Sequence, residues 1–67
     1  MPEFTTRKAD ARIFGTFEEC LEYKDTIPTP TRRFCRMVTP EGAKPGDGFV
    51  IEKTVAFSGS DSSVWVA

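Results

Sequence analysis

The spacing of apolar residues predicts one amphipathic helix over residues 17–25, FEECLEYKD. Its apolar stripe, at the i, i+3, i+4 spacing, consists of Phe17, Cys20 and Leu21. Thr16 and Glu19 match a capping box, which predicts that the helix begins after Thr16. Pro28 and Pro30 predict that it ends before them, since proline disfavours a helix interior and the residue ahead of it.

Alternation of apolar and polar residues predicts strands on both sides of this helix. The strongest is 49–57, FVIEKTVAF, which is rich in β-branched and aromatic residues. One face of that strand would carry Phe49, Ile51, Lys53, Val55 and Phe57, and the other Val50, Glu52, Thr54 and Ala56. Shorter strands are predicted at 11–15, 32–39 and 64–67, with a loop at 40–48 in which glycine and proline favour turns.

The predicted order β-α-β-β-β indicates an α+β fold. We expect a two-layer sandwich in which one short helix packs on a three- to four-stranded, mainly antiparallel sheet. Residues 1–67 would form a single domain, with 1–10 as a loose arm that Phe4 could anchor. The sheet face away from the helix carries apolar residues as well, which is typical of a partner surface.

Composition adds that the core must be small and largely aromatic. The chain has 67 residues, among them six Phe, one Tyr and one Trp. Nine basic and ten acidic residues give a net charge of −1, which disfavours a general nucleic-acid or membrane binder. The charges are clustered, however. Basic residues gather at 7–12 and 32–36, and acidic residues at 18–25.

The most suggestive stretch for function is TRRFCRM, residues 31–37. As a strand, it would place Arg36 beside Phe34 on one face, as a nucleic-acid platform requires. Alternatively, Cys35 and Met37 enter the core while the arginines are solvated or pair with acids of the helix. A third interpretation is a positive patch for an acidic protein partner.

Residues for catalysis or metal binding are scarce. The chain has no histidine, so neither Cys20 nor Cys35 has the usual base to activate it, and no zinc site is expected. We therefore predict no enzyme activity and no cofactor. One disulfide is conceivable, but two cysteines without a signal peptide favour reduced thiols in a soluble, cytoplasmic protein.

Three further residues are candidate partner contacts. Lys44 lies in the predicted loop, where Asp47 is a weaker candidate, and Trp65 lies in the last strand. Lys53 is a charge on an otherwise apolar strand face, which is costly unless the group is paired or reaches water. A β-bulge could turn it outward, or its stem could extend to the surface.

We therefore expect a small non-enzymatic binding protein that docks on another macromolecule, such as an inhibitor or adaptor of the kind that phages encode. Its expected partner is a protein, with no membrane role and with a homodimer through a sheet edge as a further possibility. The candidate contact residues are Arg32, Arg33, Phe34, Arg36, Lys44, Lys53 and Trp65. The alternative is a nucleic-acid-binding protein that uses Arg32, Arg33 and Arg36 together with Arg7 and Lys8.

Overall fold

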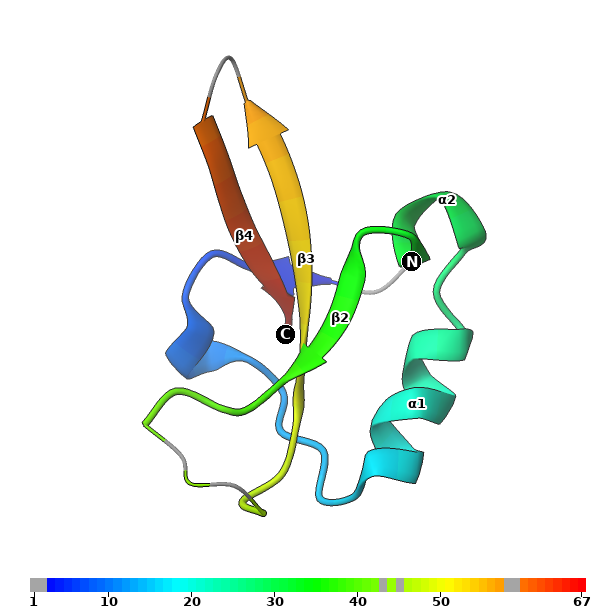
Figure 1. Cartoon of the computed structure of the whole chain (residues 1–67), viewed down its shortest axis with the longest axis vertical. Coiled ribbons are helices and arrows are strands. Elements are labelled where there is room, and N and C mark those ends of the chain that lie inside the picture. Colours follow the sequence, from blue (N-terminus) through cyan, green and yellow to red (C-terminus); the bar gives the residue numbers. More distant parts are fainter. Residues whose placement is uncertain (1–2, 43, 45, 58–59) are drawn as a thin grey trace.

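A computed structural model describes residues 3–42, 44, 46–57 and 60–67, and for residues 56, 57, 60 and 61 only the backbone. Its strands lie beside its helices, as Figure 1 shows. The elements in chain order are β1 (Phe4–Thr5), the 3-10 turn η1 (Lys8–Asp10), α1 (Phe17–Asp25), α2 (Thr29–Arg32), β2 (Cys35–Val38), β3 (Val50–Phe57) and β4 (Ser60–Val66).

The strands form one antiparallel sheet in the order β1-β4-β3-β2. This arrangement confirms the predicted α+β fold with a short helix on an antiparallel sheet. The first strand lies at Phe4–Thr5, so the prediction of a strand at 11–15 is wrong. That segment contributes a single bridge between Phe14 and Phe49. The arm at 3–5 is held by the far end of the chain, since the N–H of Ala67 donates to the carbonyl of Glu3.

Helix α1 covers the predicted residues, and its cap explains where it begins. The Thr16 hydroxyl accepts a hydrogen bond of 3.1 Å from the Glu19 N–H, which satisfies one free donor of the first turn. The helix is rotated relative to the predicted apolar stripe. Cys20 is fully buried, whereas Phe17 and Leu21 remain 50% and 37% exposed. The side of α1 that faces the sheet therefore carries Cys20, and Ile27, which follows the helix, is buried as well.

Helix α2 was not predicted, and it shortens the strand that follows. The prolines were expected to hold an extended segment, which is wrong: Pro28 is the N-cap and Pro30 lies in the first turn. Proline is tolerated there because its missing N–H would have no partner in the first turn. The expected strand at 32–39 therefore begins only at Cys35.

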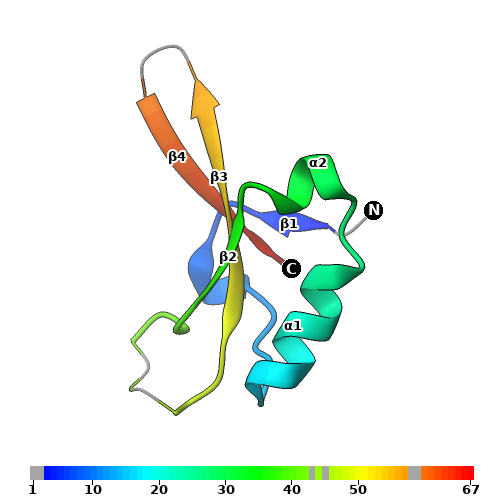
Figure 2. The ribbon, with the colours of Figure 1, turned by 45° about the vertical axis from the view of Figure 1, so that its right-hand side comes forward.

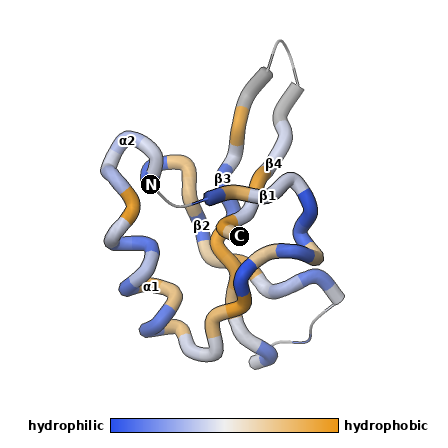
Figure 3. Tube along the Cα trace, turned by 180° about the vertical axis from the view of Figure 1, so that it is seen from behind, coloured by the Kyte–Doolittle hydropathy of each residue, from blue (hydrophilic) through white to orange (hydrophobic). Residues whose placement is uncertain are grey.

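Figure 2 shows α1 and α2 on one side of the sheet, and the core lies between them and the sheet. Its buried members are Phe14, Cys20, Ile27, Cys35, Ile51 and Val66. Tyr23 lies 5.2 Å from Phe14 between ring centroids and closes the core on the helix side. Figure 3 shows apolar residues gathering near the C-terminus, where the strands meet. This packing holds β2, β3 and the end of β4 in place, and the upper part of the β3–β4 hairpin projects beyond it (Figure 1).

The opposite sheet face is also partly covered. Val50 is fully buried there, and Glu52 beside it on β3 is only 8% exposed. The turn η1 lies on this side of the sheet, away from α1 (Figures 1 and 2). The sheet is therefore buried on both faces at its centre, which explains why β3 lacks a clean alternation of buried and exposed residues between Val50 and Glu52.

Candidate functional site

An apolar groove lies where α2 meets the sheet. It has a volume of about 400 Å³. The residues that line it are Pro30, Thr31, Phe34, Lys53, Thr54 and Val55. Phe34 is 57% exposed, so it leaves a large apolar area in contact with water. We call this feature the Phe34 groove.

The backbone on both sides of Phe34 is fixed, so its side chain is held at the groove by structure on either side. The Phe34 N–H donates to the carbonyl of Thr31 in α2, at 3.1 Å. The Phe34 carbonyl accepts from the Thr54 N–H of β3, at 3.0 Å. Phe34 thus lies where α2 meets the edge of β3.

The groove borders an open strand edge. β2 pairs with β3 only as far as Cys35, which lies opposite Lys53. From Val55 to Phe57, β3 pairs with β4, and no described strand adjoins its other side. Backbone groups alternate between the two edges of a strand. Because the Thr54 N–H points toward the β2 side, the backbone of Ala56 faces the same open edge.

Lys53 lines the groove and is partly buried. The register runs without interruption from Glu52 opposite Trp65 to Thr54 opposite Ser63, which excludes a bulge, one of the two expected explanations for Lys53. The Lys53 ammonium lies 5.3 Å from the centre of the Phe4 ring. A cation at that distance from an aromatic face is attracted to it, which offsets part of the cost of leaving water.

The three arginines of the TRRFCRM stretch lie on different elements. Arg32 ends α2, where Nη1 donates to the Asp25 carbonyl at 3.2 Å and lies 3.9 Å from its carboxylate. Arg33 is exposed at the C-cap of α2. Arg36 lies on β2, and its Nε is 2.8 Å from Glu52 Oε1. The predicted strand faces hold only from Cys35 onward, and no single basic platform includes all three.

Trp65 belongs to the other face of the sheet. It pairs in register with Glu52 on one side and with Thr5 on the other, so a row of Arg36, Glu52, Trp65 and Thr5 crosses the four strands. The indole Nε1 is buried without a hydrogen-bond partner among the described residues. Trp65 is thus separated from the Phe34 groove by the sheet itself.

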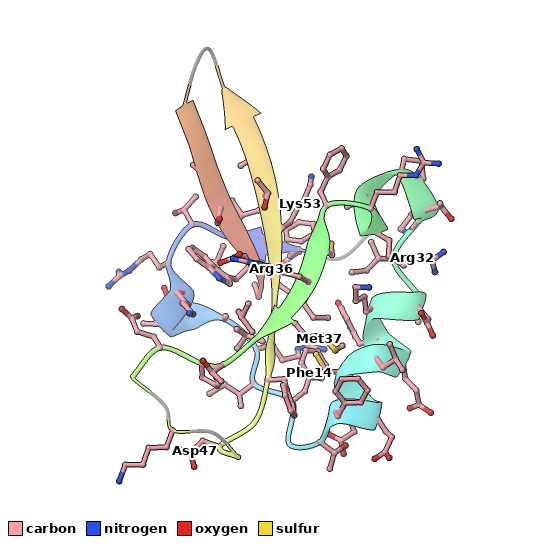
Figure 4. All side chains as sticks on the ribbon, viewed as in Figure 1. Phe14, Arg32, Arg36, Met37, Asp47 and Lys53 are labelled. Atoms are coloured by element: carbon pink, nitrogen blue, oxygen red, sulfur yellow. The ribbon has the colours of Figure 1, made fainter. Side chains whose placement is uncertain are left out.

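Lys44 lies at the end of the molecule away from the groove. Its N–H donates to Asp47 Oδ2 at 2.9 Å, and the Asp47 N–H donates to the Lys44 carbonyl at 3.1 Å. Figure 4 shows Asp47 at the lower end of the molecule, well below Lys53. Of the seven predicted contact residues, the structure brings only Phe34 and Lys53 together in the groove.

Cys20 and Cys35 are free and buried. Burial raises the pKa of both thiols above the ordinary value, and the positive charge of Lys24 opposes part of this shift. Both thiols are therefore protonated near neutral pH, and a protonated thiol is a poor nucleophile.

In the described part of the chain, no group of three or more Cys, Asp or Glu residues could hold a metal ion. None of the described helices has the length and apolar character needed to cross a bilayer.

A second hollow of about 370 Å³ lies along α1 and is lined by Phe14, Glu19, Glu22, Tyr23 and Thr26. The Arg12 guanidinium lies 5.3 Å from the centre of the Tyr23 ring. The chain thus places one of its own cations beside this acidic hollow, whereas the Phe34 groove presents an exposed ring and an open strand edge.

Sequence reasoning found Phe34 and Lys53 but missed the groove that joins them. Pro30 and Thr31 were expected in an extended segment, and only their helix places them beside β3.

Comparisons with protein families, curated proteins and solved structures find no match. A function for the chain therefore has to be inferred from its own residues.

Proposed function

We propose that this protein is a small non-enzymatic binding protein, an inhibitor or adaptor, that docks on another protein through the Phe34 groove. The observation that carries the proposal is the 57% exposed Phe34 at the junction with an open strand edge. Exposed aromatic residues in apolar hollows are typical anchors of protein interfaces. The free thiols of Cys20 and Cys35 suit a reducing compartment such as the cytoplasm.

The open edge of β3 suggests how docking would occur. An extended segment of the partner would lie along Val55–Phe57 and continue the line of β2, donating to and accepting from the free backbone groups. Main-chain hydrogen bonds of this kind supply affinity, and pockets for alternate side chains supply specificity. The Phe34 groove would receive one such side chain.

Two observations support a protein partner over nucleic acid. Arg32 and Arg36 each have a carboxylate within 4 Å, at 3.9 Å and 2.8 Å, so their charges are partly neutralised. Phe34 also precedes β2, so it lies outside the strand that carries Arg36 and on which the two were expected to form one platform.

Affinity capture with matched variants tests the proposal. The tagged chain and its Phe34→Ala and Phe17→Ala variants are incubated with lysate of the source cells, and retained proteins are identified by mass spectrometry. Phe17 is a suitable control because it is a similarly exposed phenylalanine, 50%, on α1. We expect a protein that the original chain and Phe17→Ala retain and that Phe34→Ala loses. Equal retention by all three would refute docking through the groove, provided that circular dichroism shows each variant folded.

A further inference from the structure

The Phe34 groove holds a cation, Lys53, that has no acidic partner among the described side chains. Ion pairs among the described residues join Arg7 to Asp10, Arg32 to Asp25 and Arg36 to Glu52, and none includes Lys53. Lys53 is partly buried, and its ammonium lies 5.3 Å from the centre of the Phe4 ring. A cation–π contact of this kind attracts the ammonium more weakly than a hydrogen-bonded carboxylate would.

We infer that the segment that docks in the Phe34 groove is an extended acidic strand whose carboxylate pairs with Lys53; the inference rests on the proposed function. The exposed Arg33 lies directly before Phe34 and has no ion pair among the described residues, so it adds to the positive charge near the groove. Charge complementarity of this kind sets which partner binds and in which register.

The register of the sheet limits where the carboxylate can lie. Side chains at alternate positions of a strand share a face. Lys53 and Val55 therefore point to the same face, the one that α1 and α2 cover, and a partner residue opposite Val55 would point there too. The partner segment should therefore carry its carboxylate on the same face as an apolar side chain, two residues away. The apolar side chain would pack on Phe34 and Pro30, which line the groove.

A second copy of this chain fits less well. Its matching open edge has the sequence Thr54-Val55-Ala56-Phe57, which contains no acid. Pairing two such edges would satisfy backbone groups but would leave Lys53 without a carboxylate. The charge in the groove thus favours a different, acidic partner.

Two capped peptides test the inference on the full chain. The probe acetyl-Thr-Val-Thr-Asp-Thr-Val-Thr-amide has valine and aspartate on one strand face, and its control has asparagine in place of aspartate. Amide chemical shifts are followed during titration at low salt. We expect shifts at Phe34, Thr54 and Val55, with the aspartate peptide binding about fivefold more tightly, the upper end for a partly exposed ion pair. Lys53→Met should remove this preference, since it keeps the apolar stem, and Lys44→Met should retain it.

The outcomes separate the inference from the proposed function. Equal affinity for both peptides, with shifts at the groove, would overturn the acidic strand while leaving docking at the groove intact. Failure of both peptides to shift the groove amides would overturn the inference as well. If light scattering shows a dimer whose formation alone shifts these amides, the occupant is a second copy and the inference is wrong. The proposed function itself fails only if Phe34→Ala captures the same proteins as the original chain.

Discussion

The pairing of Arg36 with Glu52 provides a sharp test of the sheet register. Arg36 on β2 lies opposite Glu52 on β3, and Arg36 Nε donates to Glu52 Oε1 at 2.8 Å. The side chain of Glu52 is 11% exposed, whereas that of Arg36 is 71% exposed. Replacing Arg36 with alanine would leave a nearly buried carboxylate without its hydrogen-bond donor.

The expected cost follows from these exposures. An unsatisfied buried polar group costs about 1–3 kcal/mol. Because Arg36 is largely exposed, water can enter the space that it leaves, so the loss should lie at the lower end, about 1–1.5 kcal/mol. In a domain of this size, each 1 kcal/mol lowers Tm by about 4–8 °C. Arg33→Ala removes an exposed arginine without an ion pair among the described residues and should cost less than about 0.5 kcal/mol.

Urea unfolding followed by the fluorescence of Trp65 measures both variants. A double-mutant cycle with Glu52→Gln then isolates the Arg36–Glu52 term, which we expect to be about 1 kcal/mol. If Arg36→Ala and Arg33→Ala cost the same, or if the coupling is zero, then Arg36 does not hold Glu52. The described register of β2 on β3 would then be wrong.

Three further predictions concern the core, the thiols and nucleic acid. Ile51→Ala removes a fully buried side chain and should lower the free energy of unfolding, measured with urea, by about 2–5 kcal/mol. That is much of the total stability of roughly 3–10 kcal/mol expected at about 0.05–0.15 kcal/mol per residue, and a loss under about 1 kcal/mol would contradict the placement of Ile51 in the core. Burial raises the pKa of Cys20 and Cys35, so above about pH 8.5 the unfolded chain loses thiol protons that the folded chain keeps, and the free energy of unfolding should fall as pH rises. Urea unfolding at about pH 8 and pH 10 checks this, and a fall just as steep in a variant with both cysteines replaced by alanine would assign it to other groups. Fluorescence anisotropy at low salt should show no binding of duplex or single-stranded DNA or RNA, and binding that weakens steeply with added salt would favour the nucleic-acid alternative.

Local signals explain what the sequence predicted correctly. The helix at 17–25 combines a capping residue, acids in its first turn and a proline after its end, and these act within a few residues of one another. The strand at 49–57 is a run of β-branched and aromatic residues, and β3 covers nearly all of it. The α+β fold class follows because a helix is combined with β3 and with β4, the strand that pairs with β3.

The missed elements depend on contacts between distant parts of the chain. β1 has two residues, and its partners Trp65 and Val66 lie at the other end of the sequence. No local sequence pattern could therefore predict this strand. Helix α2 has four residues, too few for helix propensity to be informative. Segment 11–15 has the composition of a strand, yet it forms only one bridge.

The candidate site shows the same division. The sequence marked Phe34 and Lys53 as unusual, because one is an aromatic residue between arginines and the other is a charge on an apolar strand face. Their proximity depends on α2 lying at the edge of β3, which only the tertiary structure supplies. The sequence also suggested that Phe34 and Arg36 lie on one strand, whereas β2 begins at Cys35, one residue after Phe34.

Hydrogen–deuterium exchange of the complex with the captured partner tests docking at the groove most directly. Amides on the open edge of a strand exchange readily until a neighbour pairs with them. We predict that partner binding slows exchange at Ala56 and in the adjoining 54–57 segment, with little change in α1. Protection confined to α1 or to the loop near Asp47, with residues 54–57 unchanged, would show that the partner docks elsewhere and would contradict the account.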